Sequence, residues 1–99
     1  MNSVNVIGRL VRDPEIYTVN DGLKLGKFTL AFSEGQKTVF VPVMMFGKLA
    51  EIAHKYLGKG SQVAVVGKLS NRKTDRGTNY LEVIADKIQF LSSNQKDIE

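Results

Sequence analysis

The side chains that most enzymes use for catalysis are scarce in this sequence. There is one histidine and no cysteine among the 99 residues. The histidine, His54, falls on the polar side of a stretch with helical spacing, which favours a solvated surface position. No carboxylates cluster at a spacing suited to acid–base chemistry or metal binding, and Asp13 and Glu15 flank Pro14 as in a turn. We therefore expect neither an enzyme nor a metal or other cofactor.

The residues over 37–46 give the strongest structural signal and carry the best candidates for binding chemistry. Their β-branched and aromatic composition is typical of a strand, in which side chains alternate between two faces. The two faces are both apolar and consist of Val39, Val41, Val43 and Met45 on one side, and of Phe40, Pro42, Met44 and Phe46 on the other. A strand beside water needs only one apolar face, so the second requires a protein layer, a subunit or a flat apolar ligand.

Phe40 and Phe46 suit a ligand made of flat rings. Proteins that bind single-stranded nucleic acid need aromatic faces on which bases stack, and a basic groove for the backbone. Six residues of strand separate the two rings by ~20 Å, a spacing suited to separate bases. The alternative is that both are core residues of a barrel; Pro42 favours the outward orientation. Tyr17 and Tyr80 are further candidate platforms, or else ordinary half-buried tyrosines.

The net charge of +4 fits a polyanionic partner and also fits an ordinary soluble domain. The densest group of cations is Arg72, Lys73 and Arg76, in a polar segment over 71–79 that we expect to be a loop or hairpin tip. Such a tip is a candidate clamp for a phosphate backbone, or simply a solvated turn. Further candidate cations lie on or beside the predicted strands, and these are Arg9, Arg12, Lys24, Lys27 and Lys48.

Alternation and turn signals predict five strands, over 3–11, 24–32, 37–46, 62–69 and 80–91, with a short pairing segment over 16–19. Leu81 is expected to be packed in the last strand. Helical spacing from Leu49 to Leu57 predicts one helix of about 11 residues, capped by Gly58.

Three glycines inside the predicted strands, Gly8, Gly26 and Gly67, supply the corners that a small closed barrel needs. This order of elements is the plan of the OB-fold, an all-β, five-stranded Greek-key barrel with one helix between strands 3 and 4. We expect one such domain over 1–92 and a short polar tail over 93–99.

Several segments together resemble the bacterial single-stranded DNA-binding protein family, over about residues 2–91. The similar segments are Val6-Ile7-Gly8-Arg9-Leu10 with Asp13-Pro14-Glu15, Phe28-Thr29-Leu30-Ala31, Phe46-Gly47-Lys48-Leu49-Ala50-Glu51, Tyr56-Leu57, Lys59-Gly60-Ser61-Gln62-Val63, Gly67-Lys68-Leu69 and Arg72-Lys73. The resemblance implies an OB-fold, no catalysis, and sequence-tolerant binding of single-stranded DNA, commonly by a homotetramer. It places Phe40 where family members carry a stacking tryptophan, and Phe46 on a stacking phenylalanine. The basic positions that it implies near the bound strand are Lys48, Lys59, Arg72 and Lys73.

The sequence departs from the family pattern in two respects. It has no tryptophan, so two further stacking tryptophans of the family are replaced, near Gln36 and at Thr74. It also ends at Lys96-Asp97-Ile98-Glu99, without the long linker and acidic tip through which family members recruit partners. Recruitment of protein partners through such a tail is therefore not expected.

These observations predict a non-enzymatic protein that binds and protects single-stranded DNA in replication, recombination and repair. We expect a homo-oligomer, a tetramer or a dimer, in the cytoplasm at the nucleoid, because neither a signal peptide nor a membrane-spanning run is evident. The alternative is an OB-fold protein-interaction module of a replication or primosome complex, which the missing tryptophans favour. RNA is a second candidate ligand, since stacking and phosphate contacts do not test for the 2′-hydroxyl.

Overall fold

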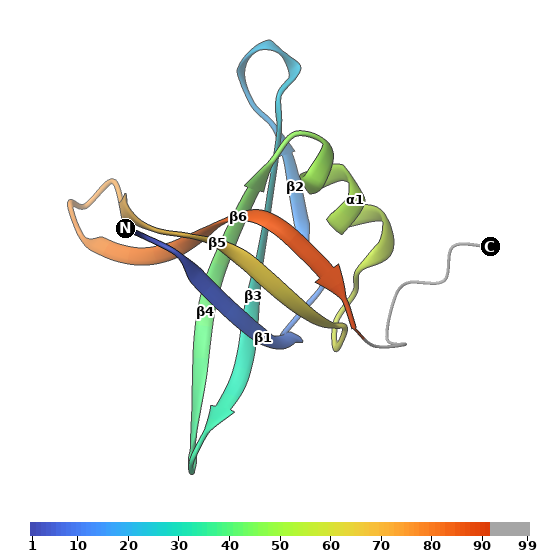
Figure 1. Ribbon diagram of the computed structural model, residues 1–99. Coiled ribbons are helices and arrows are strands. Elements are labelled where there is room, and N and C mark those ends of the chain that lie inside the picture. Colours follow the sequence, from blue (N-terminus) through green and yellow to red (C-terminus); the bar gives the residue numbers. More distant parts are fainter. Residues whose placement is uncertain (92–99) are drawn as a thin grey trace.

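The computed structural model describes residues 1–91, so the predicted polar tail over 93–99 lies outside the described residues. The elements in chain order are β1 (Val4–Leu10), β2 (Glu15–Thr18), the 3-10 turn η1 (Asn20–Gly22), β3 (Lys24–Glu34), β4 (Lys37–Phe46), α1 (Lys48–Tyr56), β5 (Gln62–Lys73) and β6 (Asn79–Phe90) (Figure 1). The predicted order of three long strands, one helix and two long strands is confirmed, and the short pairing segment over 16–19 is present as β2.

The strands form one sheet in the order β1-β5-β6-β4-β3-β2, and an additional pairing of β1 with β3 closes it into a barrel. Closure occurs where Arg9 pairs with Ala31 and Leu10 pairs with Leu30. The pairing of β4 with β6 is parallel, and the other strand pairs are antiparallel. Because α1 lies between β4 and β5 in the chain, this is the predicted all-β OB-fold barrel with its helix between strands 3 and 4.

Side chains that alternate along the strands fill the barrel interior. The buried strand residues of this core are Leu10, Phe28, Leu30, Val43, Met45, Val63, Val65, Val83 and Ala85. Helix α1 adds Ala50 and Ala53 to the same core. Gly26 lets the helix approach β3 closely, since a Cβ there would lie 2.7 Å from Met45 Sδ and 2.9 Å from Ala50 Cβ.

The β5–β6 hairpin, which projects from the barrel in Figure 1, is longer than predicted. The segment over 71–79 contains the predicted hairpin tip, but the tip is confined to residues 74–78, because pairing continues from Asn71 with Leu81 to Lys73 with Asn79. Polar side chains do not prevent this, since the backbone hydrogen bonds are made across the two strands while both faces meet water. Leu81 was predicted to be packed; it is 57% exposed, because it lies on this ribbon beyond the barrel.

Two further details of the prediction are wrong. Helix α1 has 9 residues, and its C-terminal cap is Leu57, whereas the N–H of Gly58 donates to Ser61 Oγ at 3.0 Å. Met44 faces outward as predicted but is only 4% exposed. Arg72 reaches it from β5, with Nη1 at 3.4 Å from Met44 Sδ, so a distant side chain covers this position.

Candidate nucleic-acid interface

Strands β3 and β4 present one outer face, whose residue pairs are set by their antiparallel register. From one end to the other, these pairs are Leu25–Phe46, Lys27–Met44, Thr29–Pro42 and Ala31–Phe40. Phe40 is 62% exposed and Phe46 is 45% exposed. The alternative that both are core residues is therefore wrong, and two aromatic side chains stand outward at separate points of the same face.

Strand β2 extends the surface beside Phe46. Tyr17 pairs with Leu25, which pairs in turn with Phe46, so three strands contribute to one row. Lys27 Nζ lies 5.9 Å from the centroid of the Tyr17 ring. Tyr17 Oη donates to Glu15 Oε1 at 2.7 Å. This hydrogen bond, and after it desolvation and the negative charge of Glu15, raises the pKa of the Tyr17 phenol.

The Phe40 end of the face lies at the barrel closure. Phe40 pairs with Ala31, and Ala31 also pairs with Arg9 of β1. Arg9 Nη1 donates to the carbonyl oxygen of Gly60 at 2.9 Å. This contact ties the guanidinium to the loop after α1, so part of its hydrogen-bonding capacity is used within the fold.

The three cations predicted for the hairpin tip do not share one surface. Arg72 lies on β5 opposite Tyr80, with its side chain 33% exposed and Nη1 3.6 Å from Glu82 Oε2. Lys73 is the next residue of the strand and points to the opposite face of the ribbon. Arg76 lies beyond the paired residues, in the tip over 74–78. The structure thus brings Arg72 onto the outer face and separates Lys73 from it.

The remaining predicted cations occupy different parts of the surface. Lys27 lies in the middle of the outer face, opposite Met44. Lys48 is exposed at the start of α1, two residues after Phe46. Lys59 is exposed in the loop after the helix, where its backbone N–H donates to Asp13 Oδ1 at 2.8 Å. Lys48 therefore follows Phe46 closely in the chain, whereas Lys59 lies beside the first turn, which is the segment over 11–14 between β1 and β2.

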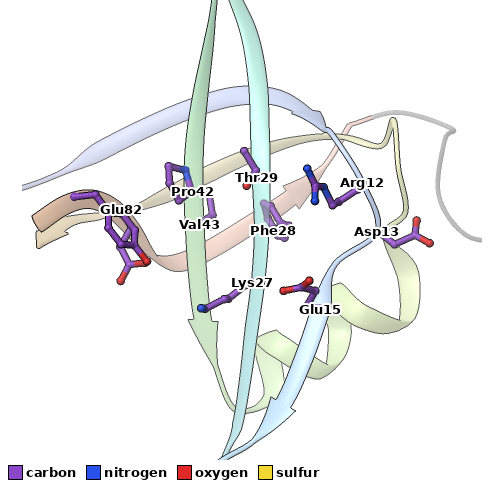
Figure 2. Close-up of a pocket in the computed structure, with 10 residues that line it drawn as sticks. Arg12, Asp13, Glu15, Lys27, Phe28, Thr29, Pro42, Val43 and Glu82 are labelled. Carbon is purple, nitrogen blue, oxygen red and sulfur yellow. The ribbon is translucent and has the colours of Figure 1, made fainter. Parts of the chain in front are cut away.

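A pocket of about 220 Å³ opens on the outer face and is lined there by Lys27, Thr29 and Pro42 (Figure 2). In the strand register these residues lie between Phe40 and Phe46. Its floor lies across β3 and β4 and consists of the outward residues Thr29 and Pro42 together with Phe28 and Val43, whose side chains belong to the core. Its polar walls come from segments far apart in the chain, Arg12 and Glu15 around the first turn and Tyr80 and Glu82 on β6. The structure therefore combines two exposed rings with an open cleft between them.

Glu82 is the residue of this site that sequence reasoning missed. It is 4% exposed and paired with Arg72, although it lies on a face predicted to bind a polyanion. In the sequence, Glu82 stands out only because it lies between the apolar residues Leu81 and Val83 of a predicted strand. This alternation indicates which face of the strand Glu82 occupies, but it does not indicate a binding role. Its place beside the pocket follows from the register that sets β6 beside β4.

The described part of the chain offers little else for chemistry. Within residues 1–91, no three His, Cys, Asp or Glu side chains gather in a way that could hold a metal ion. Over the same residues, no helix has both the length and the apolar character needed to cross a bilayer.

Comparison with known proteins places this geometry in a family. The model of the Single-strand binding protein family matches residues 1–91. "Single-stranded DNA-binding protein 1" of Staphylococcus aureus (strain MSSA476) is 37% identical over 108 residues, which cover 98% of this chain and 69% of that protein. "Single-stranded DNA-binding protein 3" of Clostridium acetobutylicum is 38% identical over 112 residues, which cover 99% of this chain and 78% of that protein.

A solved structure shows the same likeness in three dimensions. A deletion mutant of the single-stranded DNA binding protein from Thermus aquaticus matches with a TM-score of 0.82 and 31% sequence identity. The match covers 94% of this chain but only 42% of that chain. On the family match and on these relatives, this chain belongs to the single-strand binding protein family.

Proposed function

We propose that this protein is a non-enzymatic, sequence-tolerant binder of single-stranded DNA that protects transient single strands in replication, recombination and repair. The observation that carries the proposal is the pair of exposed rings, Phe40 and Phe46, on either side of an open cleft. Relatives that are named as single-stranded DNA-binding proteins support the same reading. Bases stack on the rings, because every base has an apolar face.

The backbone follows cations that border the two rings. Lys27 lies between the rings, Lys48 follows Phe46, and Arg72 reaches across β6 toward β4. Arg72 is held by Glu82 and lies against Met44, so it loses less side-chain freedom on binding than a free arginine. The same carboxylate offsets part of its charge, so Lys27 and Lys48 carry more of the attraction to phosphate.

Binding of a labelled oligothymidine is expected to be micromolar or tighter at low salt and to weaken steeply as salt rises. If about five phosphates are neutralised, the association constant falls about a hundredfold between about 50 mM and about 200 mM salt, because bound counterions are released. Fluorescence anisotropy at a series of salt concentrations measures this slope.

The same titration tests the rival interpretation. No binding of oligothymidine at the lowest salt would overturn the proposal and favour a protein-interaction module. Duplex DNA of the same sequence content is the matched ligand control, since its bases are not free to stack on Phe40 and Phe46. An oligouridine ribonucleotide shows whether the site distinguishes DNA from RNA.

We further propose that the protein is a homo-oligomer, a tetramer or a dimer, and that copies meet through β1 and β5. Ile7 is 58% exposed and Val66 is 37% exposed on the outer face of these strands. Ile7 pairs with Ala64, and Asn5 pairs with Val66, so the two apolar side chains lie close together. Before Arg9, β1 pairs only with β5 among the described residues, which leaves one strand edge open.

Sedimentation velocity is expected to give a mass above that of one chain, and Ile7→Asp is expected to lower it toward the monomer. A charge placed on a face that copies bury is costly to desolvate. Leu81→Asp is the matched control, because Leu81 is 57% exposed on the β5–β6 ribbon, away from this face. A monomeric parent protein, or equal masses for Ile7→Asp and the parent, would refute the assignment.

A further inference from the structure

The proposed function leaves open what fills the pocket between the two phenylalanines, and this inference rests on that function. We infer that the pocket takes one base of the bound strand, and that Glu82 favours a base with an exocyclic amino group, cytosine, adenine or guanine, over thymine. The pocket is lined by Glu82 on one wall and by Glu15 on the opposite wall (Figure 2). A protein that is otherwise tolerant of sequence would then have one position with a preference.

The charges of the pocket suit a base and not a phosphate. Its lining contains two cations, Arg12 and Lys27, and three carboxylates, Asp13, Glu15 and Glu82. A phosphate placed inside would face these carboxylates, and like charges repel strongly at short range. The phosphates therefore stay outside the pocket, where exposed cations that do not line it, such as Lys48, can neutralise them.

The floor and one wall suit a flat, uncharged ring. Pro42 offers the floor an apolar ring beside Thr29, while Phe28 and Val43 turn their side chains into the barrel core, where they are 5% and 2% exposed. Tyr80 lines the wall and is 38% exposed, which leaves part of its ring face available to a base. A base that enters between them buries its faces against apolar atoms and presents its polar edge to the carboxylates.

Glu82 is better placed than Glu15 to read that edge. Glu82 is 4% exposed, and its position is held by Arg72 at 3.6 Å. Glu15 is exposed, and its Oε1 already accepts the hydrogen bond of Tyr17 Oη. A hydrogen bond to a buried, fixed carboxylate is stronger than one to a mobile carboxylate in water.

The preference follows from what a carboxylate can do. An ionised carboxylate accepts hydrogen bonds and donates none. Cytosine, adenine and guanine carry an exocyclic amino group, N4, N6 or N2, whereas thymine has none, and its one ring donor, N3–H, lies between the carbonyl oxygens O2 and O4. An exocyclic amino group donates to Glu82, whereas the two carbonyl oxygens beside the thymine N3–H are repelled by it.

The test replaces one nucleotide of an oligothymidine, position by position, with deoxycytidine or with deoxyuridine. These two bases differ at the edge that Glu82 reads and both lack the thymine methyl group, so stacking is closely matched. At one position of the oligonucleotide, we expect deoxycytidine to give about fivefold tighter binding than deoxyuridine. At the other positions, the two nucleotides should give equal affinities. Equal affinities for the two oligonucleotides at every substituted position would overturn the inference and leave the proposed function intact.

Variants assign the preference to its carboxylate. Glu82→Gln should bring the deoxycytidine-to-deoxyuridine ratio to about one, because an amide donates as well as accepts. Glu34→Gln removes one negative charge from an exposed residue that does not line the pocket and should keep the ratio of the parent. An unchanged ratio in Glu82→Gln, or a lost ratio in the Glu34→Gln control, would contradict the assignment.

A modified base makes the test independent of how the Glu82 variant folds. N4,N4-dimethyl-deoxycytidine has no amino hydrogen to donate, so the parent protein should bind it no better than deoxyuridine. If the parent prefers the dimethylated base as strongly as deoxycytidine, hydrogen bonding to Glu82 is excluded. Failure of the unmodified oligothymidine to bind would instead count against the proposed function itself.

Discussion

The double variant Phe40→Ala and Phe46→Ala is expected to bind oligothymidine roughly a hundredfold more weakly than the parent. Each stacked base contributes about 1–3 kcal/mol, so two lost platforms together cost about 3 kcal/mol. Both side chains are exposed, at 62% and 45%, so their removal should leave the fold intact. Fluorescence anisotropy at constant salt measures the change, and circular dichroism checks the fold.

The salt dependence of this variant separates stacking from phosphate contact. Neither substitution removes a charge, so the slope of log affinity against log salt should match that of the parent. Leu81→Ala is the matched control, because it truncates another exposed apolar side chain on the β5–β6 ribbon. The stacking assignment is wrong if the double variant binds as tightly as Leu81→Ala, even when DNA binding itself stands.

Leu30→Ala is expected to lower the free energy of unfolding by about 3 kcal/mol. Leu30 is 0% exposed, belongs to the barrel core and pairs with Leu10 where the barrel closes. Truncation of a buried leucine loses its transfer free energy and leaves a cavity, which costs about 2–5 kcal/mol. That is a large share of the 5–15 kcal/mol by which such domains are typically stable.

Urea unfolding at a fixed protein concentration measures this loss, since the stability of an oligomer depends on concentration. The midpoint should fall while the slope of the transition stays constant, because the surface exposed on unfolding is similar. Leu81→Ala should shift the midpoint far less, because its side chain is already in water. If Leu30→Ala lowers the free energy of unfolding no more than Leu81→Ala does, the stability of the barrel closure does not depend on Leu30.

Local patterns determined most of the architecture. Strand period, helix period and turn residues act over a few neighbours, so they predicted the long strands, the helix and their order. The outward orientation of Phe40 and Phe46 followed from alternation within β4. Gly67, predicted at a barrel corner, lies where the register of β5 with β6 shifts, and a Cβ there would overlap the carbonyl oxygen of Ile84.

The errors fall where residues distant in the sequence decide the outcome. Met44 is covered because Arg72 reaches it from β5. The residues next to Met44 in β4 give no sign of this contact, because Arg72 is distant in the sequence. Lys73 leaves the predicted cation cluster because pairing with Asn79 extends β5 and alternation then separates it from Arg72. Leu81 has the pattern of a core residue, but the ribbon carries it past the end of the barrel.

The sequence by itself therefore determined the barrel plan and the outward aromatic residues, because both arise from periodicity within single strands. The tertiary structure decided the site between them. Strand register placed Tyr17, Leu25 and Phe46 in one row and brought the first turn and β6 to opposite walls of one pocket. Register depends on pairing between strands that are far apart in the chain, and this is why Glu82 became part of the site only when the barrel closed.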